Sequence, residues 1–163
     1  MTIARIAIVL ALTAGLAACA SKFETYRGPA VTQLQVYKSE RLMYLMHGNT
    51  VLKALPVSLG ADPIGPKHVY GDYKTPEGLY YIDRRNPRSG YYLALGISYP
   101  NEHDVQVARA MGEPPGGDIF IHGQRGSRTD RSDWTAGCIA VANKDMRDVY
   151  AMVKTGTPIF IMP

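Results

Sequence analysis

Short runs of alternating apolar and polar residues dominate the first half of the chain. Residues 33–60 contain three such runs, which are broken by polar or glycine-containing groups at residues 38–40 and 48–50. A period of two residues with turn-forming residues between the runs is typical of antiparallel strands joined by hairpins. The pattern therefore predicts a three-stranded antiparallel meander, followed by a loop rich in glycine and proline over residues 60–76.

Four further strands are predicted in the rest of the chain. Tyrosine, aliphatic and β-branched residues favour strands at residues 78–84 and 91–98. Short apolar runs favour two more strands, at residues 118–122 and 157–162. The stretch at residues 123–134 is polar and has no period, so we expect it to be irregular.

Two short helices are also predicted. Asn101 can cap a helix that ends near Met111, with acidic residues in the first turn, where the helix dipole favours them. Asn143 can cap a second helix, in which residues 146–153 place apolar side chains at positions i, i+3, i+4 and i+7. Because strands outnumber helices and crossover helices are few, the expected fold is mainly β: an antiparallel β-sandwich or barrel with two short helices.

The N-terminal residues 1–18 have a different character. Arg5 is their one charge, and the apolar stretch at residues 6–18 is too short, at about 1.5 Å per residue, to cross a hydrocarbon layer about 30 Å thick. This favours a secretory signal peptide over a buried N-terminal helix. Leu16-Ala17-Ala18-Cys19 resembles the lipobox of bacterial lipoproteins. That resemblance implies cleavage before Cys19, lipid attachment to Cys19 and a linker over residues 19–30.

The chain has two cysteines, and lipid attachment at Cys19 would leave Cys138 without a partner in an oxidising compartment. A single thiol of this kind either forms an intermolecular bridge or is kept for its reactivity. The third alternative is a small buried apolar residue, which is the commonest fate of a free cysteine. The number of cysteines alone leaves all three open.

Composition narrows the classes of function. The chain after the signal peptide is long enough for one domain, which we expect over residues 31–163. The formal net charge is +4, and positive and negative residues are interspersed. Because there is no basic tract, nucleic-acid binding is not expected.

Catalytic chemistry is predicted at His122 and Cys138. A cysteine attacks as a thiolate. It therefore needs a nearby imidazole to accept its proton or a nearby positive charge to stabilise the thiolate. Among the four histidines, His122 ends an apolar strand where a polar loop begins, and Cys138 follows sixteen residues later. The other three histidines are expected to be solvated surface residues. We therefore predict Cys138 as the nucleophile and His122 as the general base.

The residues before Cys138 suggest how a substrate would be held. Gly137 lets the backbone adopt conformations that other residues avoid, and the amides of Gly137 and Cys138 could form an oxyanion hole. Thr135 either caps the turn or contacts substrate, while Trp134 and Asp133 are expected mainly to anchor the loop. A single cysteine with scattered histidines does not have the spacing of a metal site, so neither a metal nor a cofactor is expected.

IFIHG at residues 119–123 and DWTAGCIAV at residues 133–141 resemble the L,D-transpeptidase (YkuD-type) catalytic domain, whose signature is His-Gly, a variable loop, Ser or Thr, any residue, and Gly-Cys. GDYKTPEGLY at residues 71–80 is similar to the family's GD-x-(R/K)-TP-x-G-x-Y segment, and residues 97–101 resemble an element of its smaller envelope members. The resemblance covers roughly residues 31–163.

The resemblance implies a β-rich domain that joins a cysteine nucleophile to a histidine base and acts on peptidoglycan stem peptides. Many family members carry His at the position of Ala136 and Arg at that of Ala140, where they are thought to hold the donor peptide, so the binding mode here is expected to differ. The residues expected to contact substrate are Gly123, Trp134, Thr135 and Tyr99.

The leading hypothesis is a peptidoglycan L,D-transpeptidase that passes through a thioester on Cys138 to an amine of a stem peptide or of a protein. Two alternatives stay open: a hydrolase of the same bonds, acting as an L,D-carboxypeptidase or as an amidase that releases wall-linked protein, and a non-catalytic lipoprotein that binds the wall. Each implies a location on the periplasmic side of the cell envelope, with the chain anchored to a membrane through lipid on Cys19.

Overall fold

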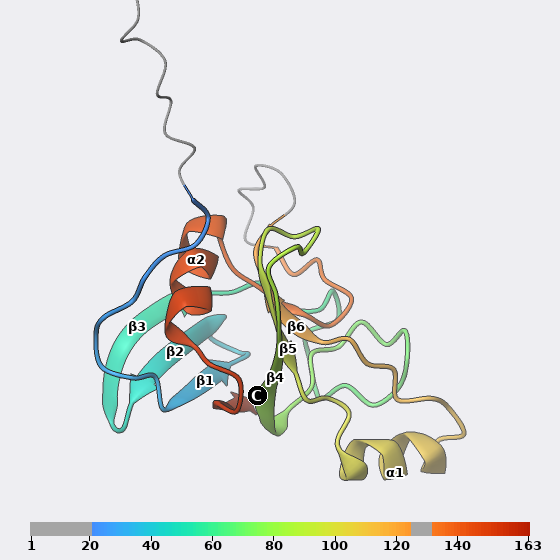
Figure 1. Cartoon of the computed structure of the whole chain (residues 1–163). Coiled ribbons are helices and arrows are strands. Elements are labelled where there is room, and N and C mark those ends of the chain that lie inside the picture. Colours follow the sequence, from blue (N-terminus) through green and yellow to red (C-terminus); the bar gives the residue numbers. More distant parts are fainter. Residues whose placement is uncertain (1–20, 125–131) are drawn as a thin grey trace, which may run out of the picture.

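The computed structural model describes residues 21–124 and 132–163, which form one curled eight-stranded sheet with two short helices (Figure 1). The predicted mainly β fold with two short helices is confirmed. The predicted signal peptide and Cys19 lie outside the described residues. In chain order the strands are β1 (Gln33–Tyr37), β2 (Leu42–His47), β3 (Thr50–Pro56), β4 (Gly78–Asn86), β5 (Ala94–Ile97), β6 (Phe120–His122), β7 (Ile139–Ala140) and β8 (Pro158–Met162).

The strands lie in the order β3-β2-β1-β8-β4-β5-β6-β7. The pairs β1 with β8 and β6 with β7 are parallel, whereas the other five are antiparallel. The sheet is therefore single and mixed, and it curls into a half-barrel instead of forming a fully antiparallel sandwich. Parallel neighbours need a long connection. Residues 123–138 connect β6 to β7, and the chain between β1 and β8 includes the other six strands and both helices.

The two predicted helices are present, but their caps differ. In α1 (Glu102–Ala110), the Asn101 side chain accepts from the Asp104 N–H while the Asp104 side chain accepts from the Asn101 N–H, so the predicted cap is confirmed as a capping box. The second helix, α2 (Asn143–Met152), begins after Ala142, which makes no side-chain cap. Asn143 is not the cap, because its side-chain oxygen accepts from the main-chain N–H of Gln124, 2.7 Å away.

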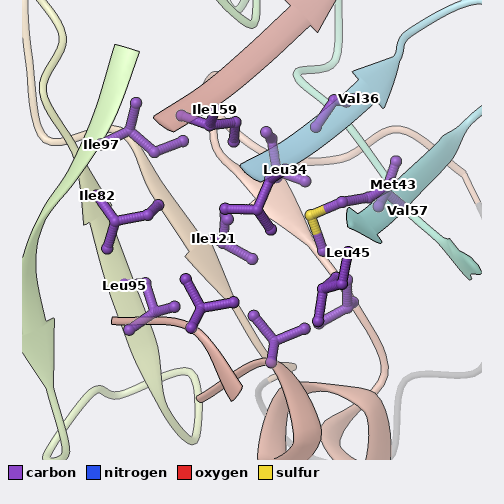
Figure 2. Close-up of a cluster of buried hydrophobic side chains, with 14 of the residues drawn as sticks. Leu34, Val36, Met43, Leu45, Val57, Ile82, Leu95, Ile97, Ile121 and Ile159 are labelled. Atoms are coloured by element: carbon purple, nitrogen blue, oxygen red, sulfur yellow. The ribbon is translucent and has the colours of Figure 1, made fainter. Parts of the chain in front are cut away.

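The core fills the concave side of the curled sheet. Figure 2 shows apolar side chains from β1 and β2 meeting those from β4, β5, β6 and β8. Helix α2 lies between β1–β3 and β4–β6 (Figure 1), and its apolar face, including Met146 and Val149, is fully buried there. The β-strand residues Leu34, Leu45 and Ile121 are also fully buried, so the two halves of the sheet share one core.

Residues 21–30, predicted as a linker, pack against the domain in the structure. The Lys22 ammonium donates to the carbonyl oxygens of Pro87, 2.5 Å away, and Tyr92, 3.2 Å away. The Phe23 ring stacks at 6.2 Å on the ring of Tyr150 in α2. Among the residues that the structure describes, no helix combines the length and apolar character needed to span a membrane.

Candidate active site

The predicted base ends β6, and the predicted nucleophile directly precedes the neighbouring strand β7. Their parallel register pairs His122 with Ala140. Because side chains alternate along a strand with a period of two, Cys138 lies on the same face as Ala140 and therefore as His122. The intervening residues, Ile121 and Ile139, are fully buried in the core. Two paired strands with a packed core behind them thus hold both groups.

A cavity of about 480 Å³ opens over this face, and both His122 and Cys138 line it. This volume is within the range of small-molecule and peptide side-chain sites. The walls come from the loop before β4, the β4–β5 hairpin, the segment leading into β6 and the turn before Cys138. The other lining residues are Tyr73, Asn86, Ser89, Tyr91, Ala94, Asp118, Phe120, Trp134, Thr135 and Ala136.

Aromatic side chains enclose the His122 ring, which lies 4.6 Å from the Tyr91 ring and 5.7 Å from the Trp134 ring between centroids. The Nδ1 atom of His122 lies 2.6 Å from the carbonyl oxygen of Gly123. A carbonyl oxygen only accepts hydrogen bonds, so Nδ1 carries the hydrogen and Nε2 keeps its lone pair. Burial lowers the pKa of His122 below its usual 6.5, against the opposing effect of the bond to Gly123. The ring is therefore neutral at pH 7 and can take up a proton at Nε2.

The sulfur of Cys138 lies against the chain segment that leads into β6. Its thiol donates to the carbonyl oxygen of Asp118, 3.5 Å away. Burial is the main cause that raises the pKa of Cys138 above its usual 9.0, and the Asp118 carboxylate adds to it. The Phe120 main-chain N–H, which donates to the sulfur, opposes both effects. The resting group is therefore a neutral thiol.

A neutral thiol and a neutral imidazole in one cavity support general-base catalysis better than a preformed ion pair. Phe120 contacts the sulfur, and His122 is two residues further along the same strand, about 7 Å by the rise of a β-strand. For this chemistry the Cys138 thiol must leave the Asp118 carbonyl oxygen and pass its hydrogen to Nε2. The sulfur can then attack a carbonyl carbon as its proton leaves.

The turn before Cys138 is held by the side chain of Thr135, which is 4% exposed. Its hydroxyl donates to the Cys138 carbonyl oxygen at 2.7 Å and accepts from the Gly137 N–H at 3.1 Å. Gly137 has a φ of 128°, and a Cβ at this position would lie 2.6 Å from the carbonyl oxygen of Lys74. The turn therefore requires glycine both for its backbone conformation and for its close packing.

Two half-buried carboxylates hold the chain segments next to this turn. Asp133 accepts from the Arg41 guanidinium and from the Leu59 N–H, each at 2.8 Å, and this matches its predicted anchoring role. Asp72 accepts from the Lys67 ammonium and from three main-chain N–H groups of residues 68–74. The GDYKTP segment at residues 71–76 thus shapes the loop whose backbone packs against the catalytic turn.

The other predicted site residues are divided between the cavity and the core. Trp134 lines the cavity, and exposed Ala136 lines it without offering any polar group. Gly123 contributes its carbonyl oxygen to His122 but does not line the cavity. Ala140 is buried beside His122. Tyr99 is 4% exposed and its hydroxyl donates to the Pro115 carbonyl oxygen, so it is a core residue and not a wall of the site.

Sequence reasoning missed Tyr73, Tyr91 and Asp118 as lining residues. Tyr73 and Asp118 both have a positive φ, of 55° and 56°, which nothing in the local sequence indicates. Tyr91 lies at the edge of a predicted strand, and its position next to His122 depends on the pairing of β5 with β6. Within residues 21–124 and 132–163, no three His, Cys, Asp or Glu side chains gather as potential metal ligands.

A thiol and an aromatic-enclosed imidazole on paired strands of a curled half-barrel define a mainly β protein with a cysteine–histidine site. The chain belongs to the L,D-transpeptidase catalytic domain (YkuD) family, whose model matches residues 32–161. The predicted family is therefore confirmed.

Individual relatives support this assignment. The protein YafK of Escherichia coli K12 is 32% identical over 136 residues, which are 80% of this chain and 50% of YafK. The helical cell shape determining protein Pgp2 of Campylobacter jejuni is 27% identical with a TM-score of 0.62, over 83% of this chain and 49% of Pgp2. Bd1075 of Bdellovibrio bacteriovorus shares the fold, with 22% identity and a TM-score of 0.58 over 86% of this chain and 50% of that protein. This chain thus spans about half the length of these relatives.

Proposed function

We propose that the protein is a peptidoglycan L,D-transpeptidase that uses Cys138 as nucleophile and His122 as general base. The observation that carries the proposal is the cavity that His122 and Cys138 both line, together with the 2.6 Å contact between His122 Nδ1 and the Gly123 carbonyl oxygen, which leaves the lone pair on Nε2. A base in this state accepts the proton that the thiol must lose. Binding to the wall alone would need neither group.

The first half-reaction forms a thioester. As Cys138 Sγ attacks the carbonyl carbon between the L-centre and the D-centre of a stem peptide, His122 Nε2 takes the thiol proton. His122 then gives that proton to the departing amine, the C–N bond breaks, and a D-amino acid leaves. The acyl group stays on Cys138 until an amine attacks the thioester and forms the cross-link, whereas attack by water would give hydrolysis.

The negative oxygen formed in each step is stabilised by main-chain N–H groups of the turn, with Cys138 as the first donor. Gly137 joins as a second donor when its N–H exchanges the 3.1 Å contact with the Thr135 hydroxyl for the oxyanion. Such a donor typically contributes about 3–4 kcal/mol to the transition state. The Thr135 hydroxyl keeps the turn in place throughout, because its bond to the Cys138 carbonyl is independent of substrate.

Incubation with tetrapeptide wall fragments tests this function. We expect the intact mass of the protein to increase by the acyl portion of the donor, and the products to include cross-linked stem-peptide dimers. The matched control is Cys138→Ala, which removes the nucleophile with little change in volume and should give neither the mass increase nor any product. Dimers formed equally by Cys138→Ala would contradict the proposal, and trimmed stems without dimers would identify the hydrolase instead.

We further propose that the protein is held at the cell envelope by lipid on Cys19. The support is the lipobox-like Leu16-Ala17-Ala18-Cys19 behind a short apolar stretch. In a bacterial host, wild-type protein is expected to incorporate labelled palmitate and to sediment with membranes, whereas Cys19→Ser should do neither. Palmitate retained by Cys19→Ser would show that the anchor is elsewhere.

A further inference from the structure

Asp118 lies beside the nucleophile, lines the cavity and carries an exposed carboxylate. Its carbonyl oxygen accepts from the Cys138 thiol at 3.5 Å, and its side chain is 91% exposed. Its φ of 56° is in the left-handed region, where aspartate and asparagine are less strained than most residues. Asp118 thus contacts the sulfur through its main chain, lines the cavity, and leaves its side chain open to solvent and to ligands.

The charge of the cavity follows from its lining. Among the described residues that line it, Asp118 is the one with a formal charge at pH 7, because burial lowers the pKa of His122 and keeps that ring neutral. A carboxylate at the wall of such a site can pair with a cation. The simplest cation in the proposed reaction is an ammonium group, the resting form of an attacking amine.

Arg84 supplies a positive charge immediately next to this carboxylate. Its Nη2 atom lies 3.1 Å from Asp118 Oδ1, and its Nη1 atom lies 2.9 Å from Asp83 Oδ2. Its guanidinium stacks 4.5 Å from the ring centre of Phe120, which also lines the cavity. A guanidinium has five N–H donors, more than these two contacts require, and its planar fork suits a carboxylate.

We propose that Asp118 and Arg84 form the subsite for the attacking amine, and that this subsite selects an amine whose carbon atom also carries a carboxylate. Asp118 binds the ammonium and Arg84 binds the neighbouring carboxylate, so the zwitterion of an amino-acid centre is paired with two opposite charges. The proposal deepens the transpeptidase function and rests on it. Such a subsite would bind a diaminopimelate-type acceptor more tightly than a lysine-type acceptor, because the side-chain amine of lysine has no carboxylate on the same carbon.

The position of Asp118 brings the bound amine to the reacting atoms. Since the carboxylate and the carbonyl that contacts Cys138 belong to one residue, an amine held by the carboxylate lies within a few ångströms of the thioester. Both charges act on the sulfur: behind the larger effect of burial, Asp118 raises the pKa of Cys138 and Arg84 lowers it.

In the transfer step, the nitrogen of the amine replaces the sulfur of Cys138 on the acyl carbon. The ammonium loses one proton to solvent, and the free amine attacks the thioester carbonyl carbon. His122 Nε2 accepts the proton that the attacking nitrogen must then lose. The C–S bond breaks, the Cys138 sulfur leaves as a thiolate, and it recovers its proton from the His122 imidazolium. The products are a new amide bond and the neutral thiol.

Binding to the Cys138→Ala protein tests the subsite without any reaction. The probes are two tripeptides, identical except that one ends in meso-diaminopimelate and the other in L-lysine. By calorimetry we expect the diaminopimelate peptide to bind about tenfold more tightly, the typical effect of one charge-assisted hydrogen bond. Adding Arg84→Gln should remove this preference and Arg84→Lys should restore part of it, since lysine keeps the charge but not the fork.

Aminolysis gives the kinetic readout. Asp118→Asn keeps a residue that tolerates the left-handed backbone but removes the charge. We expect it to raise the half-saturating concentration of both tripeptides about tenfold in aminolysis of the preformed thioester. Exposed charges on or beside α1 provide matched controls, and neither Arg109→Gln nor Glu113→Gln should change acceptor use.

Equal binding of the two peptides, or a preference unchanged by Arg84→Gln, would overturn the subsite. If wild-type protein still formed the thioester and the cross-link in that case, the transpeptidase function would stand and the inference alone would fail. Absence of any thioester on wild-type protein would overturn both.

Discussion

Replacing His122 by alanine is expected to slow thioester formation about 10³- to 10⁴-fold, within the range of a lost general base. The physical reason is the raised pKa of the Cys138 thiol. Burial raises the pKa of Cys138 above 9.0, so at neutral pH almost no thiolate exists unless a base takes the proton during attack. The rate is measured as the appearance of acyl-protein by intact mass in a single turnover. His103→Ala, an exposed histidine in the first turn of α1, is the control and should keep the wild-type rate.

The pH dependence provides a second measure of the same role. Below its pKa, His122 is protonated and accepts no proton; because burial lowers that pKa from 6.5, wild-type activity should fall only at pH values below 6.5. Above it the rate should stay level towards the raised pKa of Cys138. In His122→Ala the rate should instead follow the thiolate fraction and rise about tenfold per pH unit through neutrality. A variant that kept the acid limb, or lost less than tenfold in rate, would exclude His122 as the base.

Gly137→Ala is expected to destabilise the protein by about 2–4 kcal/mol and to slow thioester formation at least about 100-fold. The added Cβ would lie 2.6 Å from the Lys74 carbonyl oxygen, which is backbone and cannot rotate away, and the φ of 128° is itself strained for alanine. Relief of the contact moves the turn that carries Cys138. Urea unfolding gives the loss of stability, and single-turnover mass analysis gives the loss of rate.

Gly156→Ala separates the two causes. Gly156 also has a positive φ, of 86°, but a Cβ there would meet nothing within 4 Å. It should therefore cost only about 1 kcal/mol, the usual penalty for alanine in this region, and leave the rate unchanged. Equal losses in the two variants would show that the contact with Lys74 has no part in holding the catalytic turn.

Local features of the fold were predictable because their causes are local. The meander over β1–β3 follows from a period of two residues and two polar turns, and the capping box at Asn101 needs only residues three positions apart. The error at Asn143 has the opposite origin. Its side chain is of a type that caps helices, but its Oδ1 atom accepts a hydrogen bond from the Gln124 N–H, 2.7 Å away. A contact between residues this far apart has no signature in the sequence.

The features of the candidate site also fall into those that the sequence determines and those that depend on tertiary contacts. The sequence by itself determined which atoms can react: one thiol after a glycine, and one histidine at the end of an apolar strand. Only the tertiary structure decided how they react. Burial lowers the pKa of His122, and the rings of Tyr91 and Trp134 from other segments pack around it, while the contact of Nδ1 with the Gly123 carbonyl oxygen sets the tautomer.

The same holds for the residues that sequence reasoning misplaced or missed. Tyrosine is a residue type that often contacts ligands, but Tyr99 is buried in the core. Arg84 and Asp118 are 34 positions apart in the sequence and form an ion pair across β4, β5 and β6. Residue types and short spacings record the chemistry that a chain can perform. Burial, charge pairing and many hydrogen bonds arise between distant segments of the chain. The protonation states of the site and the proposed acceptor subsite therefore depend on the folded sheet.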